Sequence, residues 1–245
     1  MGAFVDSEIV GRWRFSTDPS RTEDEHGLLI SGLLRGLKNN GAEIGRAAIC
    51  SVVPPVTETV YSALERITAE RPFVVGPGIR TGIKIKYDRV QDVGNDRVAD
   101  AVAVHLMYGG PAIVVDIGTF TVFDAVTEDG TYVGGAIAPG PSLSAESVFL
   151  RASQLRRVEL VEPPTAIGRN TVHAMQSGTI YGHVSLVEGM IRRFRVELCK
   201  ADPSRCIVVA TGGLASLISG CTDVFDHVNP DLTLIGLRLL YEKNQ

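Results

Sequence analysis

Residues 112–140 constrain the fold of this chain more than any other segment, because three strand patterns follow one another there. The first pattern is an apolar run that ends in the acidic-glycine turn Asp116-Ile117-Gly118-Thr119. The second passes through Phe123-Asp124-Ala125-Val126, and the tight turn Glu128-Asp129-Gly130 leads to the third at Tyr132–Ala138. The segment therefore predicts three consecutive strands, with a glycine turn after the first and a hairpin between the other two.

Helical and strand patterns alternate along the rest of the chain, which is typical of an α/β protein. The clearest helix start is a capping box, Thr22-Glu23-Asp24-Glu25, ahead of a leucine-rich stretch. Further helices are predicted over residues 96–107, 170–198 and 232–241, and further strands over residues 47–53, 73–75 and 207–210.

The charge of the chain argues against nucleic acid as a partner. The formal net charge is −4, and neither a basic tract nor an interleaving of basic and aromatic residues occurs. The length of 245 residues with 44% apolar residues fits one large domain or two small ones.

The cysteines and the apolar runs indicate a cytoplasmic protein that does not enter a membrane. The four cysteines lie far apart without a CxxC pair, which argues against a zinc site or a disulfide framework and suits a reducing compartment. The N-terminus lacks a basic segment followed by an apolar one, and no apolar run approaches the roughly 18 residues needed to span a bilayer.

The turn at residues 116–119 has the residue types that a phosphate site needs. Gly118 allows backbone amides to approach phosphate oxygens, Thr119 offers a hydroxyl, and Asp116 can hold a cation directly or through water. Taken alone, the pattern is also consistent with an acidic turn that only caps a loop.

Several spaced motifs, in order, make the chain similar to one family. It resembles the type III pantothenate kinases from about Phe4 to Asn244. The matching motifs are Lys86-Tyr87-Asp88, Val93–Arg97, Asp116–Asp124, Gly134–Gly140, Gly168-Arg169-Asn170-Thr171, Gln176-Ser177-Gly178 and Ala210-Thr211-Gly212-Gly213.

The resemblance implies an α/β fold of duplicated actin-like, ribonuclease H-like domains, with mixed sheets flanked by helices. The expected N-terminal domain is residues 1–105 and the expected C-terminal domain is residues 106–245. The family opens with a strand and a DxGNT phosphate loop, for which this chain has no counterpart. It starts about a dozen residues late, the length of a strand and its loop. On this basis little kinase activity is expected, either because a gene start was placed too far downstream or because the chain is an impaired relative.

The resemblance also implies a reaction, the ATP-dependent phosphorylation of pantothenate, and a role for each matching residue. Asp96 is expected to be the general base or hydroxyl-orienting carboxylate. Gly94, Asn95 and Arg97 are expected to line the pantothenate pocket together with Tyr87. Thr171 is expected to bind pantothenate from the neighbouring subunit of a homodimer.

For the nucleotide, the resemblance implies that Gly118 and Thr119 contact ATP. Asp116 is expected to bind the K⁺ or NH₄⁺ that these enzymes require, and Mg²⁺ is expected to arrive with the nucleotide. Without the resemblance, Asp96 would be interpreted as a helix N-cap, and Tyr87 as a half-buried strand aromatic.

Three residues depart from the family pattern. Asn95 stands where alanine is usual, and Phe120 and Val122 replace alanine and threonine beside the phosphate turn. These departures motivate an alternative, a non-catalytic family member that acts as a transcription accessory or binding protein. A kinase for another small alcohol, such as a sugar, is the remaining alternative, against which Gly76–Gly82 and Gly94–Arg97 count.

Overall fold

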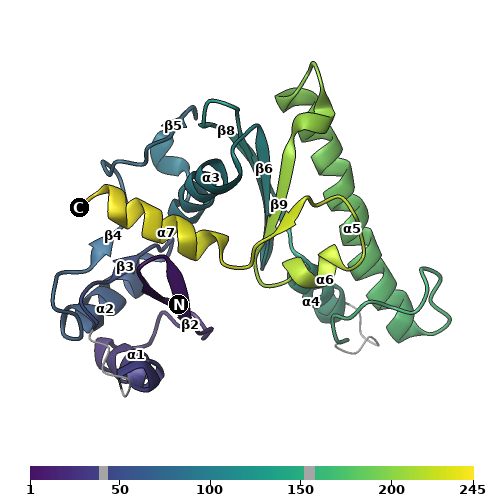
Figure 1. Ribbon diagram of the computed structural model, residues 1–245. Coiled ribbons are helices and arrows are strands. Elements are labelled where there is room, and N and C mark those ends of the chain that lie inside the picture. The colour runs from purple at the N-terminus through teal and green to yellow at the C-terminus, as the bar shows by residue number, and fades with distance from the viewer. Residues whose placement is uncertain (39–43, 152–157) are drawn as a thin grey trace. The chain divides into compact units, whose positions relative to one another are not determined.

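The computed structural model describes residues 1–38, 44–151 and 158–245, which form two compact units (Figure 1). Unit 1 comprises Met1–Thr81, Gln91–Ala99 and Leu234–Gln245, and unit 2 comprises Gly82–Val90 and Asp100–Thr233. Both units are therefore discontinuous in the sequence. The expected division into duplicated domains at residues 1–105 and 106–245 stays a prediction.

Unit 1 is built from two strand pairs and the helices around them. One pair is an antiparallel hairpin and the other is a short parallel pair. Its elements are β1 (Gly2–Val5), β2 (Glu8–Arg12), α1 (Glu23–Lys38), β3 (Ala48–Ile49), α2 (Pro54–Glu65), β4 (Phe73–Val74), the start of α3 (Asn95–Tyr108) and most of α7 (Leu232–Lys243).

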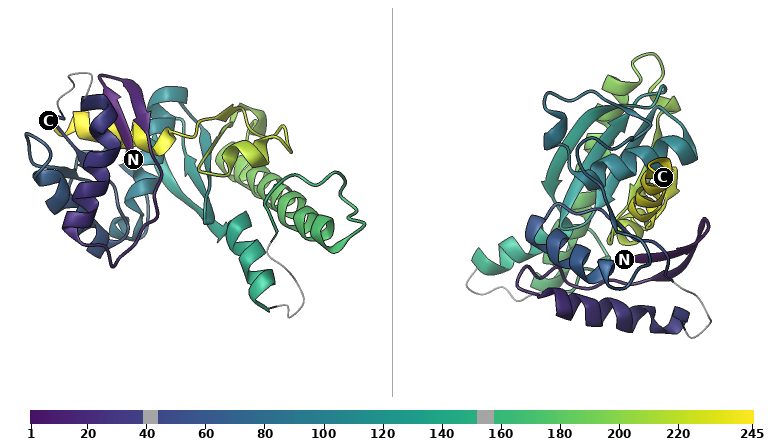
Figure 2. Two further views of the ribbon diagram at one scale, coloured as in Figure 1. Left: turned by 90° about the horizontal axis from the view of Figure 1, so that it is seen from below. Right: turned by 90° about the vertical axis from the view of Figure 1, so that its left-hand side faces the viewer.

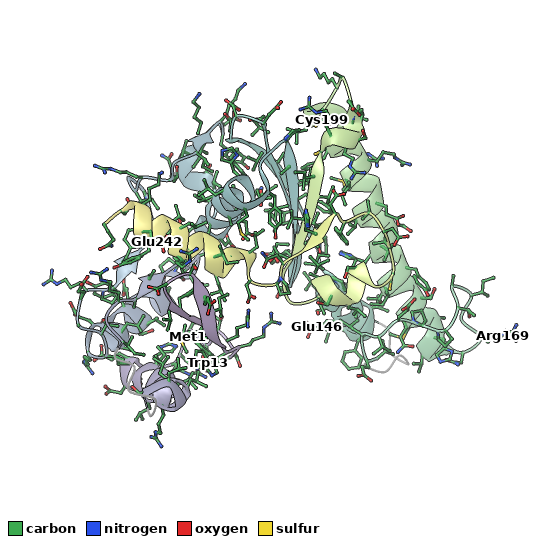
Figure 3. All side chains as sticks on the ribbon, in the orientation of Figure 1. Met1, Trp13, Glu146, Arg169, Cys199 and Glu242 are labelled. Atoms are coloured by element: carbon green, nitrogen blue, oxygen red, sulfur yellow. The ribbon has the colours of Figure 1, made fainter. Side chains whose placement is uncertain are left out.

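Met1 forms two hydrogen bonds with Trp13 where the two strands of the N-terminal hairpin end. The amino group of Met1 donates to the carbonyl of Trp13 at 2.8 Å, and the Trp13 amide donates back to the Met1 carbonyl at 2.9 Å (Figure 3). The turn between the strands contains Asp6, whose φ of 52° lies in the left-handed region that an aspartate tolerates.

Helix α1 begins at the predicted capping box. The Thr22 amide donates to Glu25 Oε2 at 2.7 Å, and the Glu25 amide donates to Thr22 Oγ1 at 3.3 Å. Two amides that no helical carbonyl can reach are thereby bonded reciprocally. Glu23 and Asp24 add negative charge to the first turn, where the helix dipole is positive.

The last helix packs within unit 1 against its earliest residues. Gly236 of α7 lies against the backbone of Ala99, and a methyl group at residue 236 would collide with the Ala99 carbonyl. The guanidinium of Arg238 lies 5.8 Å from the centre of the Phe4 ring, so that a cation–π contact joins the two ends of the sequence. Figure 2 shows α7, in yellow, beside the elements of unit 1 in both views.

Unit 2 is organised around a six-stranded mixed sheet in the order β10-β9-β6-β7-β8-β5. Its antiparallel centre, β6-β7-β8, confirms the three strands predicted over residues 112–140, and β5, β9 and β10 pair parallel to their neighbours. Its elements are β5 (Lys84–Ile85), the 3₁₀ turn Val90–Asp92 at its border, the rest of α3, β6 (Ala112–Ile117), β7 (Phe120–Val126), β8 (Thr131–Pro139), α4 (Pro141–Arg151), α5 (Thr171–Leu198), the 3₁₀ turn Pro203–Arg205, β9 (Ile207–Thr211), α6 (Ala215–Ser219) and β10 (His227–Val228).

Helix α5 forms the main core of unit 2 with one face of this sheet (Figure 1). A stripe at helical spacing turns toward the sheet, where it meets apolar residues of β6, β7 and β9. The stripe is Ile180, Val184, Val187 and Ile191, and the strand residues are Ile113, Val115, Ile117, Phe123 and Val208. Since these residues are nearly all inaccessible to water, the sheet edge at the ends of β6 and β9 rests on a rigid base.

The same order of elements occurs in both units, which confirms the expected fold class. In unit 1 the series is the hairpin β1–β2, α1, β3, α2 and β4. In unit 2 it is the hairpin β7–β8, the helices α4 and α5, then β9, α6 and β10, with β6 preceding the series. The last two strands of each series pair in parallel, β3 with β4 in unit 1 and β9 with β10 in unit 2. Within the described residues, no helix has both the length and the apolar composition that crossing a membrane requires.

Candidate active site

The first turn of α3 holds four of the expected site residues, Gly94 to Arg97, in unit 1. The Val98 amide donates to the Gly94 carbonyl at 3.1 Å, so Gly94 is the residue that caps the helix. Asp96 is thus inside the first turn rather than at the N-cap, and its Oδ1 accepts from the Arg97 amide at 2.9 Å. This oxygen lies so close to the α-carbon of Gly94 that a methyl group there would collide with it.

Asp96 also lines a cavity of about 290 Å³ within unit 1. Most of the cavity wall is apolar and comes from β3 and the start of α2, with three hydroxyl groups among it. The lining residues are Thr17, Ile49, Cys50, Ser51, Val52, Val53, Val56, Thr57, Val60 and Asp96. A carboxylate beside an apolar wall with a few polar groups is the composition of a site for a small molecule with both apolar and hydroxyl parts.

Asn95 binds backbone groups with its amide. Its Nδ2 donates to the Val75 carbonyl at 2.9 Å and to the Ser51 carbonyl at 3.3 Å. These carbonyls follow β4 and β3, so one side chain joins the α3 start to the ends of both strands. These two bonds explain why asparagine is present at residue 95, where alanine is usual in the family that the chain resembles. The expected contact of Asn95 with pantothenate stays a prediction.

Three turns that contain glycine meet at one edge of the sheet in unit 2. They are the Asp116–Thr119 turn, the turn at Gly140 and the turn at Gly212-Gly213. The Gly140 amide donates to the Thr119 carbonyl and the Leu214 amide donates to the Ile117 carbonyl, both at 2.9 Å. A methyl group on Gly140 would collide with the carbonyls of Gly118 and Thr119. Sequence analysis gave no site role to Gly140, although its motif is part of the resemblance.

Asp116 lies at the centre of this edge. It pairs with Thr211 in β9 and with Val122 in β7, and a methyl group on Gly212 would collide with its carboxylate. Gly212 has a φ of +92°, a conformation that favours glycine, so both its backbone and the nearby carboxylate require the absence of a side chain. The motif Ala210-Thr211-Gly212-Gly213, which is part of the resemblance, was the sequence signal that could have indicated the contact between Gly212 and Asp116.

The two apolar departures lie beside this turn, as expected. Val122 stands directly opposite Asp116 in the ladder, and Phe120 follows Thr119 immediately, with 52% of its surface exposed. Thr119 is itself exposed, so its hydroxyl is accessible at the turn.

A buried polar pair lies behind the turn. Thr121 Oγ1 and His183 Nε2 are 2.9 Å apart, with Thr121 fully buried and His183 5% exposed. Burial lowers the pKa of His183, so the ring is neutral at pH 7. None of the sequence motifs described above includes His183. Its position within the apolar stripe of α5 was the signal that it faces the sheet.

Tyr87 and Thr171 lie on separate elements of unit 2. Tyr87 follows β5 in the sequence. Its ring lies against Gly134 and 6.2 Å from the ring of Tyr132. Thr171 is the exposed first residue of α5, after the N-cap Asn170, whose side chain accepts from the His173 amide at 2.9 Å.

The structure thus collects the expected site residues into two groups and two single positions. Gly94, Asn95, Asp96 and Arg97 share one helical turn, and Asp116, Gly118 and Thr119 share one strand turn. Across the described residues, no group of three or more His, Cys, Asp or Glu side chains is placed to hold a metal ion.

Comparison with known proteins identifies the family. A family model described as type III pantothenate kinase matches residues 1–193. The type III pantothenate kinase of Moorella thermoacetica is 45% identical over 244 residues, which is 100% of this chain and 94% of that protein. The enzyme of the same name from Streptomyces griseus is 47% identical over 249 residues, with the same coverage.

A solved structure agrees with the fold. It is a conserved candidate transcriptional activator of the Baf family from Campylobacter jejuni, with a TM-score of 0.55 and 18% identity, covering 84% of this chain and 87% of that one. At this identity the likeness concerns the fold alone. The family match and the full-length relatives decide the assignment: this chain belongs to the type III pantothenate kinase family.

Proposed function

We propose that the chain transfers a phosphoryl group from ATP to the primary alcohol of pantothenate, giving 4'-phosphopantothenate, the first step of coenzyme A biosynthesis. The observation that carries the proposal is the identity of 42–47% with relatives named for this kinase, over the whole of the chain. The alternative, a non-catalytic family member that acts as a transcription accessory or binding protein, is not favoured, since the full-length relatives are named for the kinase.

A coupled assay of ADP release tests the proposal. The 245-residue chain is incubated with ATP, Mg²⁺, K⁺ and pantothenate. Turnover on the order of one per second, within the usual enzyme range, supports the proposal and would overturn the expectation of little activity. Turnover of a panel of sugars without turnover of pantothenate would replace this function with that of another small-alcohol kinase. No turnover of any alcohol, with ATP bound, would favour a binding protein.

On the acceptor side, we assign Asp96 to orient the attacking hydroxyl and accept its proton. Phosphoryl transfer requires mainly positioning and charge stabilisation, so one fixed carboxylate is sufficient for this task. The support is its place on the cavity of unit 1, where the apolar wall suits the methyl groups of a branched alcohol. We assign Gly94, Asn95, Arg97 and Tyr87 to the rest of the pantothenate site.

On the nucleotide side, we assign Gly118 and Thr119 to the phosphates of ATP and Asp116 to a monovalent cation, K⁺ or NH₄⁺. A single carboxylate among backbone carbonyl groups suits an ion of low charge, and three glycine turns leave backbone close to the site. Mg²⁺ usually binds substrate phosphates with few protein ligands, and we propose that it arrives with the nucleotide. A bound cation would offset phosphate charge.

We further propose that the enzyme is a cytoplasmic homodimer in which Thr171 completes the neighbouring subunit's pantothenate site. Thr171 is exposed at the start of α5, and in Figure 3 the adjacent Arg169 extends outward from unit 2. All four cysteines are free thiols, which supports a reducing compartment.

The role of Asp96 predicts the effect of Asp96→Asn. The amide keeps the size of the side chain but cannot accept a proton, so we expect kcat to fall by about 10²- to 10⁴-fold while the Kd for pantothenate changes little. Steady-state kinetics and calorimetric titration with pantothenate measure the two quantities. Glu58→Gln, an exposed neutralisation on α2, is the matched control and should leave both unchanged. Unchanged turnover in Asp96→Asn would remove Asp96 from the chemistry.

A further inference from the structure

The Thr121–His183 pair joins the main helix of unit 2 to the strand that leaves the phosphate turn. His183 belongs to α5 and Thr121 to β7, and the two side chains approach to 2.9 Å in a region closed to water. Each polar group therefore depends on the other for its hydrogen bond, because burial without one is costly.

Thr121 occupies a particular place in the ladder. It stands opposite Ile117, the last paired residue of β6 before the turn, and the next bond along is from the Gly118 amide to the Phe120 carbonyl at 2.9 Å. The position of Thr121 over α5 therefore sets where β7 leaves Gly118 and Thr119.

The neighbours of His183 on α5 cannot set that position with the same accuracy. Ile180, Val184 and Val187 pack on the sheet through apolar contacts, which have no preferred direction. A hydrogen bond weakens steeply when its angle or length changes. One directional contact within an apolar interface therefore fixes the strand where the interface alone would permit small shifts.

We propose that His183 is a positioning residue for the nucleotide phosphates, acting through Thr121 on the Gly118–Thr119 turn. The inference rests on the proposed function of that turn. It assigns to His183 no contact with substrate, and it predicts an effect on ATP that pantothenate does not share.

The test compares four variants of the 245-residue chain with wild type: Thr121→Val, His183→Leu, the double variant, and His183→Gln, whose amide can replace the ring nitrogen. In the two apolar single variants we expect the KM for ATP to rise about five- to tenfold, in keeping with the loss of one buried hydrogen bond, and the KM for pantothenate to stay within about twofold. In the double variant the effects should not add, since both substitutions remove one contact. His183→Gln should lie close to wild type.

Tyr181→Phe is the matched control on the same helix. It removes the hydroxyl that lies 3.1 Å from Glu162 Oε1 and 3.2 Å from the Pro163 carbonyl, two acceptors that belong neither to β7 nor to the Gly118–Thr119 turn. It should lower the melting temperature without changing either KM. Equal changes in both KM values in Thr121→Val, or none, would overturn the inference and leave His183 a structural residue.

A binding measurement separates this inference from the proposed function. The Kd of a fluorescent ATP analogue, measured by anisotropy, should rise in Thr121→Val and His183→Leu by the same factor as the KM. A wild-type chain that binds the analogue but does not phosphorylate pantothenate would refute the proposed function, and the binding comparison would still decide the role of His183. If His183→Leu does not fold, Thr121→Val and His183→Gln decide it.

Discussion

At the scale of single residues, Asn95 connects three segments of unit 1. Its amide bonds the carbonyls of Ser51 and Val75, and its backbone belongs to the turn that carries Asp96. The alanine that is usual in the resembled family cannot make these bonds. Asparagine at residue 95 is therefore compatible with an intact pantothenate site, because its larger side chain is bonded to the backbone at the ends of β3 and β4.

Asn95→Ala is consequently expected to destabilise this protein even though it restores the usual family residue. Two partly buried carbonyls lose their donor, so the free energy of unfolding should fall by about 1–3 kcal/mol. Urea denaturation measures the change. Asn95→Asp, which places carboxylate oxygens against the same carbonyls at unchanged size, should destabilise more. An unfolding free energy equal to that of wild type in Asn95→Ala would show that water replaces the amide.

At the scale of elements, the start of α1 allows a test of how much the Thr22–Glu25 capping box stabilises the protein. The Thr22 hydroxyl accepts from the Glu25 amide, and it is exposed, so its removal leaves the core intact. Thr22→Ala should therefore lower the free energy of unfolding by about 0.5–2 kcal/mol. Thr22→Ser keeps the hydroxyl and should stay near wild type in the same denaturation experiment. Equal stability of the alanine and serine variants would mean that the capping box contributes nothing here.

Elements with such local signals were predictable, and those without were not. The meander of β6, β7 and β8, the start of α1 and the extent of α5 were predictable because the signal for each lies in consecutive residues. Helix α2 escaped prediction because it lacks the usual polar start signal: its N-cap residue is Val53, whose side chain makes no cap bond. Strands β5 and β10 have two residues each and, unlike the equally short β3 and β4, they do not lie in an apolar run that would reveal a buried strand.

The site divides along the same line. The Asp116–Thr119 turn was predicted because its chemistry is local in sequence. The contacts of Gly140 and Gly212 with that turn, and the bond between Thr121 and His183, join residues far apart in the chain. Only the folded sheet brings them together, so no sequence pattern of a single chain contains them.

At the scale of the whole molecule, the surface around Thr171 bears on assembly. The segment before α5 is fixed to that helix: Gln176 Nε2 donates to the Glu159 carbonyl at 3.1 Å, and Ser177 Oγ donates to the Ala166 carbonyl at 2.5 Å. Ile167 nevertheless has 83% of its surface exposed, and Val172 has 47%. Held rigidly beside Thr171, such apolar groups are a typical interface composition.

Ile167→Asp should therefore convert the proposed dimer to a monomer, because a charge at the interface would lose its water on assembly. Size-exclusion chromatography with light scattering measures the mass. The monomer should also show a raised KM for pantothenate with an unchanged KM for ATP, since Thr171 would no longer reach a neighbouring site. Val196→Asp, a similarly exposed valine near the other end of α5, should leave mass and kinetics unaltered. A wild-type chain that is monomeric while fully active would show that Thr171 acts within its own subunit or not at all.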